Sequence, residues 1–168
     1  MQVYLTNTSN MPIEATEGEF PAIMLKKYVL RKDSGGAGEF RGGLGIWREY
    51  TVLNDNVAVN CFGDRQRFAP WGMEGGLDGE PGAFYHISAE TGAVTKLSAK
   101  TTGFPLKKGD IIRVFTPGAG GVGDPKKRPV EKVLQDVREN KVSREAAETL
   151  YGVCITEKEN GQLDAVRI

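Results

Sequence analysis

Residues 33–45 read DSGGAGEFRGGLG, and six of these thirteen residues are glycine. The chain contains 22 glycines, and two further clusters occupy residues 72–82 and 118–123. Glycine adopts positive φ angles and lets two backbones approach closely, so clusters of this kind mark turns and crossings between strands. The glycine pattern therefore predicts a β-rich fold.

Short segments with the alternation of half-buried strands lie between the glycine clusters. Asn54-Asp55-Asn56 separates the second and third of them and predicts a hairpin, and Glu90-Thr91-Gly92 predicts another between the fourth and fifth. The last segment, IIRVF, is apolar enough to be buried. The expected strands cover residues 24–30, 46–53, 57–62, 84–88, 94–97 and 111–115.

The pattern changes after residue 125. From Pro129 onward, apolar residues fall at i, i+3, i+4 and i+7, as in an amphipathic helix with proline in its first turn. Ser143 is a suitable N-cap for a second helix over residues 144–151, and Gly152 is a suitable left-handed terminator. These features predict a helical hairpin.

The final residues, 153–168, contain Asn160-Gly161 and indicate one more β-hairpin. Together these elements predict a mainly β protein with a C-terminal helical hairpin, in the α+β class. We expect a glycine-rich antiparallel β-domain over residues 1–125, with the helical hairpin and C-terminal extension of residues 126–168 packed on it.

Charge and composition exclude several classes of protein. Lysine and arginine together number 22, as do aspartate and glutamate, so no basic field exists to attract nucleic acid or an anionic membrane. The N-terminus lacks the basic and apolar regions of a signal peptide, and no long apolar run occurs. We expect a cytoplasmic location. Cys61 and Cys154 lie far apart, which argues against a zinc site or a disulfide framework.

Residues 118–123, GAGGVG, match the pattern G-x-G-x-x-G of dinucleotide-binding proteins. That fingerprint requires a helix that begins directly on the glycine turn, but Asp124, Pro125 and a basic loop intervene here. A structural glycine turn is therefore the favoured interpretation. Its glycines are Gly118, Gly120, Gly121 and Gly123.

Few residues suggest catalysis or metal binding. The only histidine, His86, has no acidic or cysteine residue clustered around it in the sequence, which favours a structural role. Glu14, Glu17 and Glu19 could collect a cation, although a solvated loop is the favoured interpretation. Cys61 is expected to be a small core residue. We assign no catalytic or metal-binding residue to this chain.

Six motifs, spread in order over about residues 5 to 153, together closely resemble the C-terminal part of the hydantoinase B/5-oxoprolinase family. That family includes B subunits of ATP-dependent hydantoinases and α-type subunits of acetone and acetophenone carboxylases. The motifs are TNTSNMPIEATE at 6–17, DSGGAGEFRGGLG at 33–45, GDR at 63–65, APWG with the glycines that follow at 69–82, TPGAGGVGDP at 116–125, and VLQDV leading to YGV at 133–153. Two positions depart from the family pattern, since Arg128 stands where relatives tend to have aspartate and Ala119 interrupts a glycine run.

The resemblance implies a subunit of an ATP-dependent cyclic amide hydrolase that is inactive alone. ATP and Mg²⁺ are expected on a hydantoinase A-type partner subunit, and a catalytic divalent metal on a chain that supplies the N-terminal part of hydantoinase B. Met1 just before the Thr-Asn-Thr segment favours a split gene for that second chain. A subunit of a ketone carboxylase remains an alternative, and so does a stand-alone β-module that binds a small ligand.

Functional residues are expected in the glycine-rich loops, because loops on a rigid β-scaffold carry binding sites. Asp64 and Arg65 could form a structural ion pair, or Arg65 could bind a carboxylate or an acyl phosphate. Trp71 could anchor a subunit contact or fill the domain's own core. The candidates for substrate or subunit contact are Asp33, Ser34, Arg41, Asp64, Arg65 and Trp71.

Overall fold

The computed structural model describes residues 12–158 and 161–168. The expected motif at residues 6–17 lies partly outside this part of the chain, as does Asn160 of the expected C-terminal turn. The elements in chain order are α1 (Ile13–Glu19), β1 (Ile23–Leu30), β2 (Ile46–Val52), β3 (Val57–Phe62), β4 (Ala83–Ile87), β5 (Val94–Leu97), β6 (Lys100–Leu106), β7 (Ile111–Phe115), the 3₁₀ turn η2 (Pro125–Lys127), α2 (Val130–Arg138), α3 (Arg144–Thr149), β8 (Val153–Glu157) and β9 (Leu163–Arg167).

The main layer is a five-stranded antiparallel sheet of order β1-β2-β7-β4-β5. The pair β3-β6 forms a second sheet, and β8-β9 forms a third. One apolar core lies between the first two sheets and is made by the buried residues Val52, Cys61, Leu97, Leu106 and Ile112. The fold is thus mainly β with a few helices, as expected.

The predicted hairpin between residues 46–53 and 57–62 is wrong. Strand β2 pairs with β1 on one edge and β7 on the other, so it has no free edge for β3. The turn between β2 and β3 instead packs on the β6–β7 turn, where the N–H of Lys108 donates to Asp55. The chain then crosses into the second sheet, where β3 pairs with β6.

One strand and one α-helix were not expected from the sequence. Strand β6 contains Gly103 and Pro105, which normally interrupt strands, and it tolerates them in a two-stranded sheet. Helix α1 contains Glu14, Glu17 and Glu19, so these residues lie in a helix and not in a loop. A Glu17 side-chain oxygen accepts a hydrogen bond from the N–H of Leu25, 2.7 Å away, and ties α1 to β1.

The remaining local predictions are confirmed. Strands β1 and β7 and the β4–β5 hairpin occupy the expected segments, and β8–β9 forms the terminal hairpin. Helix α2 starts after Pro129 without a side-chain cap, while the Ser143 hydroxyl caps α3 by accepting from Ala146 N–H at 3.0 Å. Gly152 follows α3 with φ of 63°.

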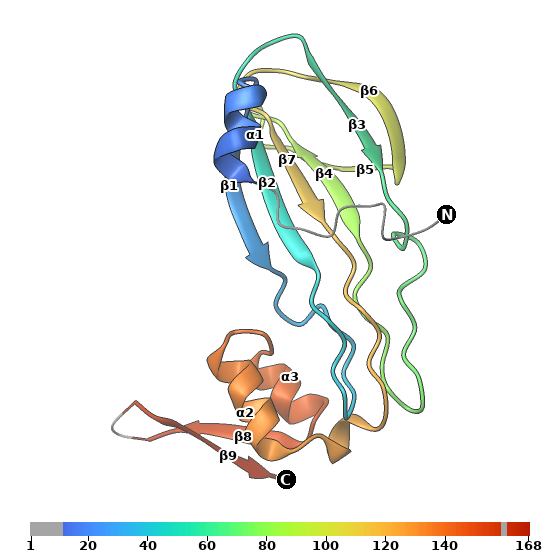
Figure 1. Ribbon diagram of the computed structural model, residues 1–168, viewed down its shortest axis with the longest axis vertical. Helices are drawn as coiled ribbons and strands as arrows, with labels where there is room; N and C mark the ends of the chain where they lie inside the picture. Colours follow the sequence, from blue (N-terminus) through green and yellow to red (C-terminus); the bar gives the residue numbers. More distant parts are fainter. Residues whose placement is uncertain (1–11, 159–160) are drawn as a thin grey trace.

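Long loops connect the two ends of the molecule. Figure 1 shows the larger sheets in the upper part, the C-terminal helices and hairpin in the lower part, and extended segments running between them. Three of these segments, residues 34–43, 70–80 and 117–123, pack together, and we call them the glycine hub. Each hydrogen-bonds to both of the others, as in Gly36 N–H to the Ala119 carbonyl at 2.8 Å and Gly121 N–H to the Leu77 carbonyl at 2.9 Å.

Backbone contact inside the hub explains its composition. A Cβ placed on Gly118 would lie 1.7 Å from the carbonyl oxygen of Ser34, and one on Gly120 would lie 1.9 Å from that of Trp71. Such positions accept only glycine, although neither has a positive φ. Ala119 is exposed and also lacks a positive φ, so its methyl group is tolerated. Gly118–Gly123 is therefore a backbone crossing in an antiparallel β-protein.

The C-terminal unit has a core of its own that reaches the hub. Its buried residues are Val133, Val142, Ala147, Tyr151 and Val153, and they pack with Ala37 of the hub. The hub thus lies between the β-sheets and the helices, and it positions the loops in which functional residues were expected.

Candidate functional site

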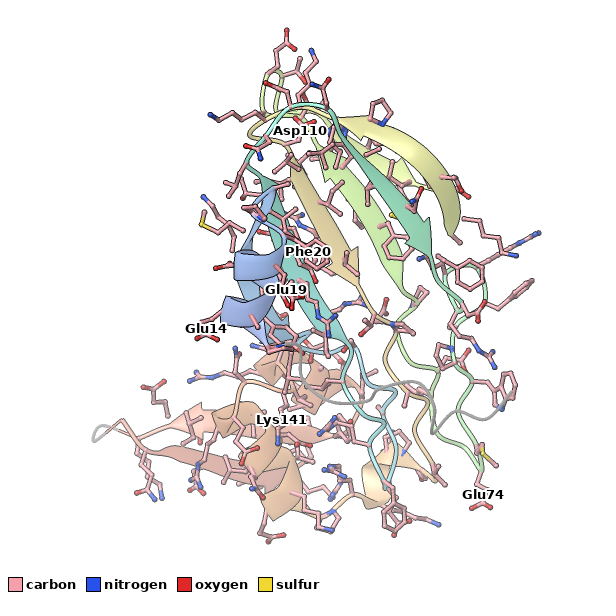
Figure 2. All side chains as sticks on the ribbon, turned by 45° about the horizontal axis from the view of Figure 1, so that its top comes forward. Glu14, Glu19, Phe20, Glu74, Asp110 and Lys141 are labelled. Carbon is pink, nitrogen blue, oxygen red and sulfur yellow. The ribbon has the colours of Figure 1, made fainter. Side chains whose placement is uncertain are left out.

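Asp33 and Ser34 are used inside the molecule. A carboxylate oxygen of Asp33 accepts from Ser143 N–H at 2.7 Å, and the Asp33 N–H donates to the carbonyl of Lys141 at 3.0 Å. Lys141 lies in the helical unit (Figure 2). The Ser34 hydroxyl is buried, donates to the Arg31 carbonyl at 2.6 Å and accepts from Gly45 N–H at 2.9 Å. Both residues hold the hub against its neighbours.

Arg41 belongs to a buried ion cluster. Its Nε donates to Asp136 of α2 at 3.1 Å, and Nη2 of Arg128 donates to the same carboxylate at 2.8 Å. Arg128 also donates to the Glu39 carbonyl at 3.0 Å, so the residue that departs from the family pattern joins α2 to the hub. Burial raises the pKa of nearby Tyr151 to about 12, although the two arginines oppose the shift. The cluster joins the hub to the helical unit.

Asp64, Arg65 and Trp71 lie together on the surface. No ion pair joins Asp64 to Arg65 among the residues that the structure describes. The Arg65 guanidinium instead lies 4.4 Å from the ring centre of Trp71, which is 63% exposed. Trp71 therefore does not fill the domain's own core.

A hollow of about 440 Å³ opens beside this pair. Three cations and one carboxylate line it, together with an exposed phenylalanine. The lining residues are Gly63, Asp64, Arg65, Gln66, Arg67, Phe68, Ala99 and Lys100. We call this feature the arginine hollow. Asp64 and Arg65 both line the hollow and are exposed, and Trp71 lies beside it through its contact with Arg65.

His86 has an acidic partner that sequence reasoning missed. Its Nε2 donates to Asp110 at 2.9 Å, and its ring packs on Phe104 with a centroid distance of 5.1 Å. Asp110 also accepts from the N–H groups of Ala89 and Lys107, both at 2.9 Å. Strand β4 pairs with β7 so that His86 lies opposite Ile112. Asp110 is two residues before Ile112, so this strand pairing places it near His86 on the same face of the sheet. Asp110 lies at the end of the β-body far from α2 and α3 (Figure 2), where it fastens two turns.

Lowering the pH should weaken the hydrogen bonds that the Asp110 carboxylate accepts from Ala89, Lys107 and His86. Burial alone would raise the pKa of Asp110, but the hydrogen bonds from Ala89, Lys107 and His86 outweigh it, so that pKa lies below its usual value. A depressed carboxyl pKa contributes stability above the unfolded pKa, and this stability is lost as pH falls through the folded pKa. We expect Asp110→Asn to unfold at lower urea concentration at neutral pH, since an amide NH₂ would face N–H donors. The wild-type advantage should shrink as the pH falls below about 3.9, the ordinary pKa of an aspartate carboxyl.

Urea unfolding of both proteins at several pH values measures this effect. An advantage of the wild type that stays constant down to acidic pH would show that the Asp110 carboxylate is not what fastens the two turns.

An apolar cavity of about 460 Å³ lies between the five-stranded sheet and the β3-β6 sheet. Its walls include Val52, Val59 and Ile112, and α1 contributes Thr16 at one side. Cys61 also lines it and is buried, and burial raises the pKa of its thiol. A thiol with a raised pKa is a poor nucleophile, so Cys61 is a core residue, as expected.

Within the described residues, no three His, Cys, Asp or Glu side chains come together in a way that could hold a metal ion. In the same ranges, no helix is both long and apolar enough to cross a lipid bilayer.

Comparison with known proteins identifies the fold. A family model described as hydantoinase B/oxoprolinase matches residues 1–125, which include the strands of the larger sheets and the whole glycine hub. The chain belongs to the hydantoinase B/oxoprolinase family. An uncharacterised protein of Methanocaldococcus jannaschii is 44% identical to it over 90% of the chain and 26% of that protein's own length.

Caprolactamase subunit beta of Pseudomonas jessenii is 36% identical over 90% of the chain and 26% of its own length. The crystal structure of the ATP-dependent caprolactamase from Pseudomonas jessenii matches this structure with a TM-score of 0.73 and 35% identity, over 90% of this chain and 26% of that one. A nucleotide-free acetone carboxylase structure also gives a TM-score of 0.73, over 86% of this chain and 23% of that one, but at 19% identity it shows only a shared fold. The chain thus spans about a quarter of the length of these relatives.

Proposed function

We propose that this chain is the glycine-rich β-module of a hydantoinase B-type subunit in an ATP-dependent enzyme that hydrolyses cyclic amides. The observation that carries the proposal is the 36% identity to caprolactamase subunit beta over 90% of the chain. Caprolactam is a cyclic amide, as are hydantoin and 5-oxoproline, after which the family is described. The likeness to acetone carboxylase concerns the fold alone, so hydrolysis is preferred over ketone carboxylation.

In this proposal the module is completed by larger partners. A hydantoinase A-type subunit binds ATP and Mg²⁺, and the remainder of hydantoinase B, on the same or another polypeptide, supplies a catalytic divalent metal. This complex is expected in the cytoplasm. The side chains of this module then serve as scaffold and contact surface, without a catalytic group of their own.

The surface of the hub supports a role in assembly. Phe40 and Met73 each form an isolated β-bridge with Val122. Both side chains are exposed. Leu77 and Trp71 of the same hub are exposed as well. Isolated exposed apolar residues are common, but several on one rigid feature are typical of a protein interface, where tryptophan and methionine are enriched.

Reconstitution tests the proposal. The chain alone and the chain assembled with an A-type ATPase and the rest of hydantoinase B are assayed for phosphate release with hydantoin, 5-oxoproline or caprolactam, and with acetone plus bicarbonate. We expect ATP hydrolysis only in the assembly and only with a cyclic amide. Turnover by the isolated chain, or activity restricted to acetone and bicarbonate, would overturn the proposal.

Substitution of Trp71 tests whether the exposed surface of the glycine hub takes part in assembly. Trp71→Ala should weaken assembly without loss of the cooperative melt of the isolated chain, because the ring is exposed. Val94→Ala in β5 is the matched control, since Val94 is an exposed apolar residue outside the hub. Equal effects of the two substitutions on assembly would contradict a role of the hub surface.

A further inference from the structure

Two arginines differ from all others in this protein. Eight of the ten arginine side chains donate a hydrogen bond to a carbonyl, a carboxylate or a hydroxyl group within the described residues. Arg65 and Arg67 have no such partner in residues 12–158 and 161–168, and both line the arginine hollow. Even the half-exposed Arg144 pairs with Glu157 at 2.7 Å, so exposure alone does not explain the difference.

Aromatic rings lie close to the cations of the hollow, and the N–H groups of the two guanidinium groups have no hydrogen-bond partner within the described residues. Arg65 packs on Trp71 at 4.4 Å, Arg67 on Phe68 at 5.4 Å, and the ammonium of Lys100 lies 5.4 Å from the ring of Phe62. A guanidinium that is stacked on a ring can still donate two parallel hydrogen bonds in its own plane to a carboxylate or phosphate. The stacking also reduces the side-chain entropy that binding would remove.

The surrounding structure also fixes the backbone of Arg65, one of five non-glycine residues with a positive φ in the described ranges. Its φ is 56°, in the left-handed region that a long side chain rarely adopts, and its carbonyl accepts from Gly82 N–H at 3.0 Å. Strain of this kind persists where the surrounding structure enforces it, and it clusters at ligand sites. The hollow contains one opposing charge, Asp64, against three cations, so its field favours an anion.

We propose that the arginine hollow binds a small ligand through a phosphate or carboxylate group, held by Arg65 and Arg67 with Lys100 at the rim. The volume of about 440 Å³ is sufficient for a ligand of metabolite size. This site does not depend on the proposed function of the chain, and the isolated chain should show it.

Titration with potassium phosphate and pyrophosphate tests the site. The protein has two tryptophans, so the indole N–H signal of Trp71 can be followed by NMR with that of Trp47 as an internal reference, after assignment with Trp71→Phe. Trp47 packs on Phe115 in the five-stranded sheet. We expect the Trp71 signal to shift saturably in the millimolar range or below, with Trp47 unmoved. Potassium chloride at equal ionic strength should cause no saturable shift.

Variants then assign the binding to the two arginines. Arg65→Asn removes the charge with a residue that tolerates a positive φ, and Arg67→Gln serves as a second, independent variant. Each should weaken pyrophosphate binding by about tenfold or more, as expected for loss of a charge-assisted hydrogen bond. Arg144→Ala is the control and should bind as the wild type does. No saturable shift of Trp71, the same shift with chloride, or unchanged affinity in folded Arg65→Asn and Arg67→Gln would overturn the proposal.

Discussion

Replacing Gly118 with alanine is expected to lower the free energy of unfolding by about 3 kcal/mol or more. The new Cβ would lie 1.7 Å from the carbonyl oxygen of Ser34 and 2.5 Å from its carbonyl carbon. These are backbone atoms, and Ser34 is held by its own hydrogen bonds to Arg31 and Gly45. The clash therefore cannot be relieved by a side-chain rotation, and two segments of the hub must separate. Urea unfolding monitored by circular dichroism measures the loss.

Gly43→Ala is the matched control for this prediction. Gly43 lies in the same hub, but nothing lies within 4 Å of the position of its Cβ and its φ is not positive. Both substitutions restrict the unfolded chain equally, which by itself stabilises a protein by about 0.4–1 kcal/mol. We expect Gly43→Ala to be neutral or slightly stabilising, so the difference between the variants isolates the backbone contact. Similar unfolding midpoints for the two would show that the hub segments do not pack backbone to backbone.

The sequence allowed much of this fold to be predicted, because most of its elements depend on local chemistry. The helices of the C-terminal unit follow from the spacing of apolar residues after Pro129 and from the cap at Ser143. The partner of β2 could not be found in this way. The turn at residues 54–56 favours a hairpin locally, but β7, which is distant in sequence, takes the edge that β3 would have used. Pairing of distant strands is a tertiary effect, and it overrode the local signal.

The candidate functional residues also show the difference between local sequence patterns and tertiary packing. Their position in loops beside glycines suggested contact with a ligand or a partner, and that pattern could not distinguish exposed from buried loops. Ser34 and Arg41 face inward because the hub segments pack together and against the helical unit, whereas Asp33 is exposed and bonds through its carboxylate to Ser143. Asp64, Arg65 and Trp71 are exposed, because residues 63–71 run along the surface of the protein. Only the three-dimensional packing separates the first group from the second.

Removing the carboxylate of Asp136 should also unfold or loosen the protein. Asp136 is 5% exposed and accepts from Nε of Arg41 at 3.1 Å and from Nη2 of Arg128 at 2.8 Å. Asp136→Ala leaves two largely buried guanidinium groups without an anion. Breaking a buried ion cluster from one side typically costs about 3–5 kcal/mol, because the remaining charges stay desolvated. We expect urea unfolding at neutral pH to show a loss of this size in the free energy of unfolding. Backbone amide hydrogens of α2 and α3 should also exchange faster than in the wild type.

The exposed pair Arg144–Glu157 provides the control, because both side chains are about half exposed. Arg144→Ala should change the free energy of unfolding by less than about 1 kcal/mol, as surface ion pairs usually do. Asp136 joins residues that belong to the hub and to the helical unit, so its loss should release the helices before the sheets unfold. Uniform exchange across the chain in Asp136→Ala would contradict this, and it would mean that the shared core around Ala37, Val133 and Tyr151 is sufficient to hold the two parts together.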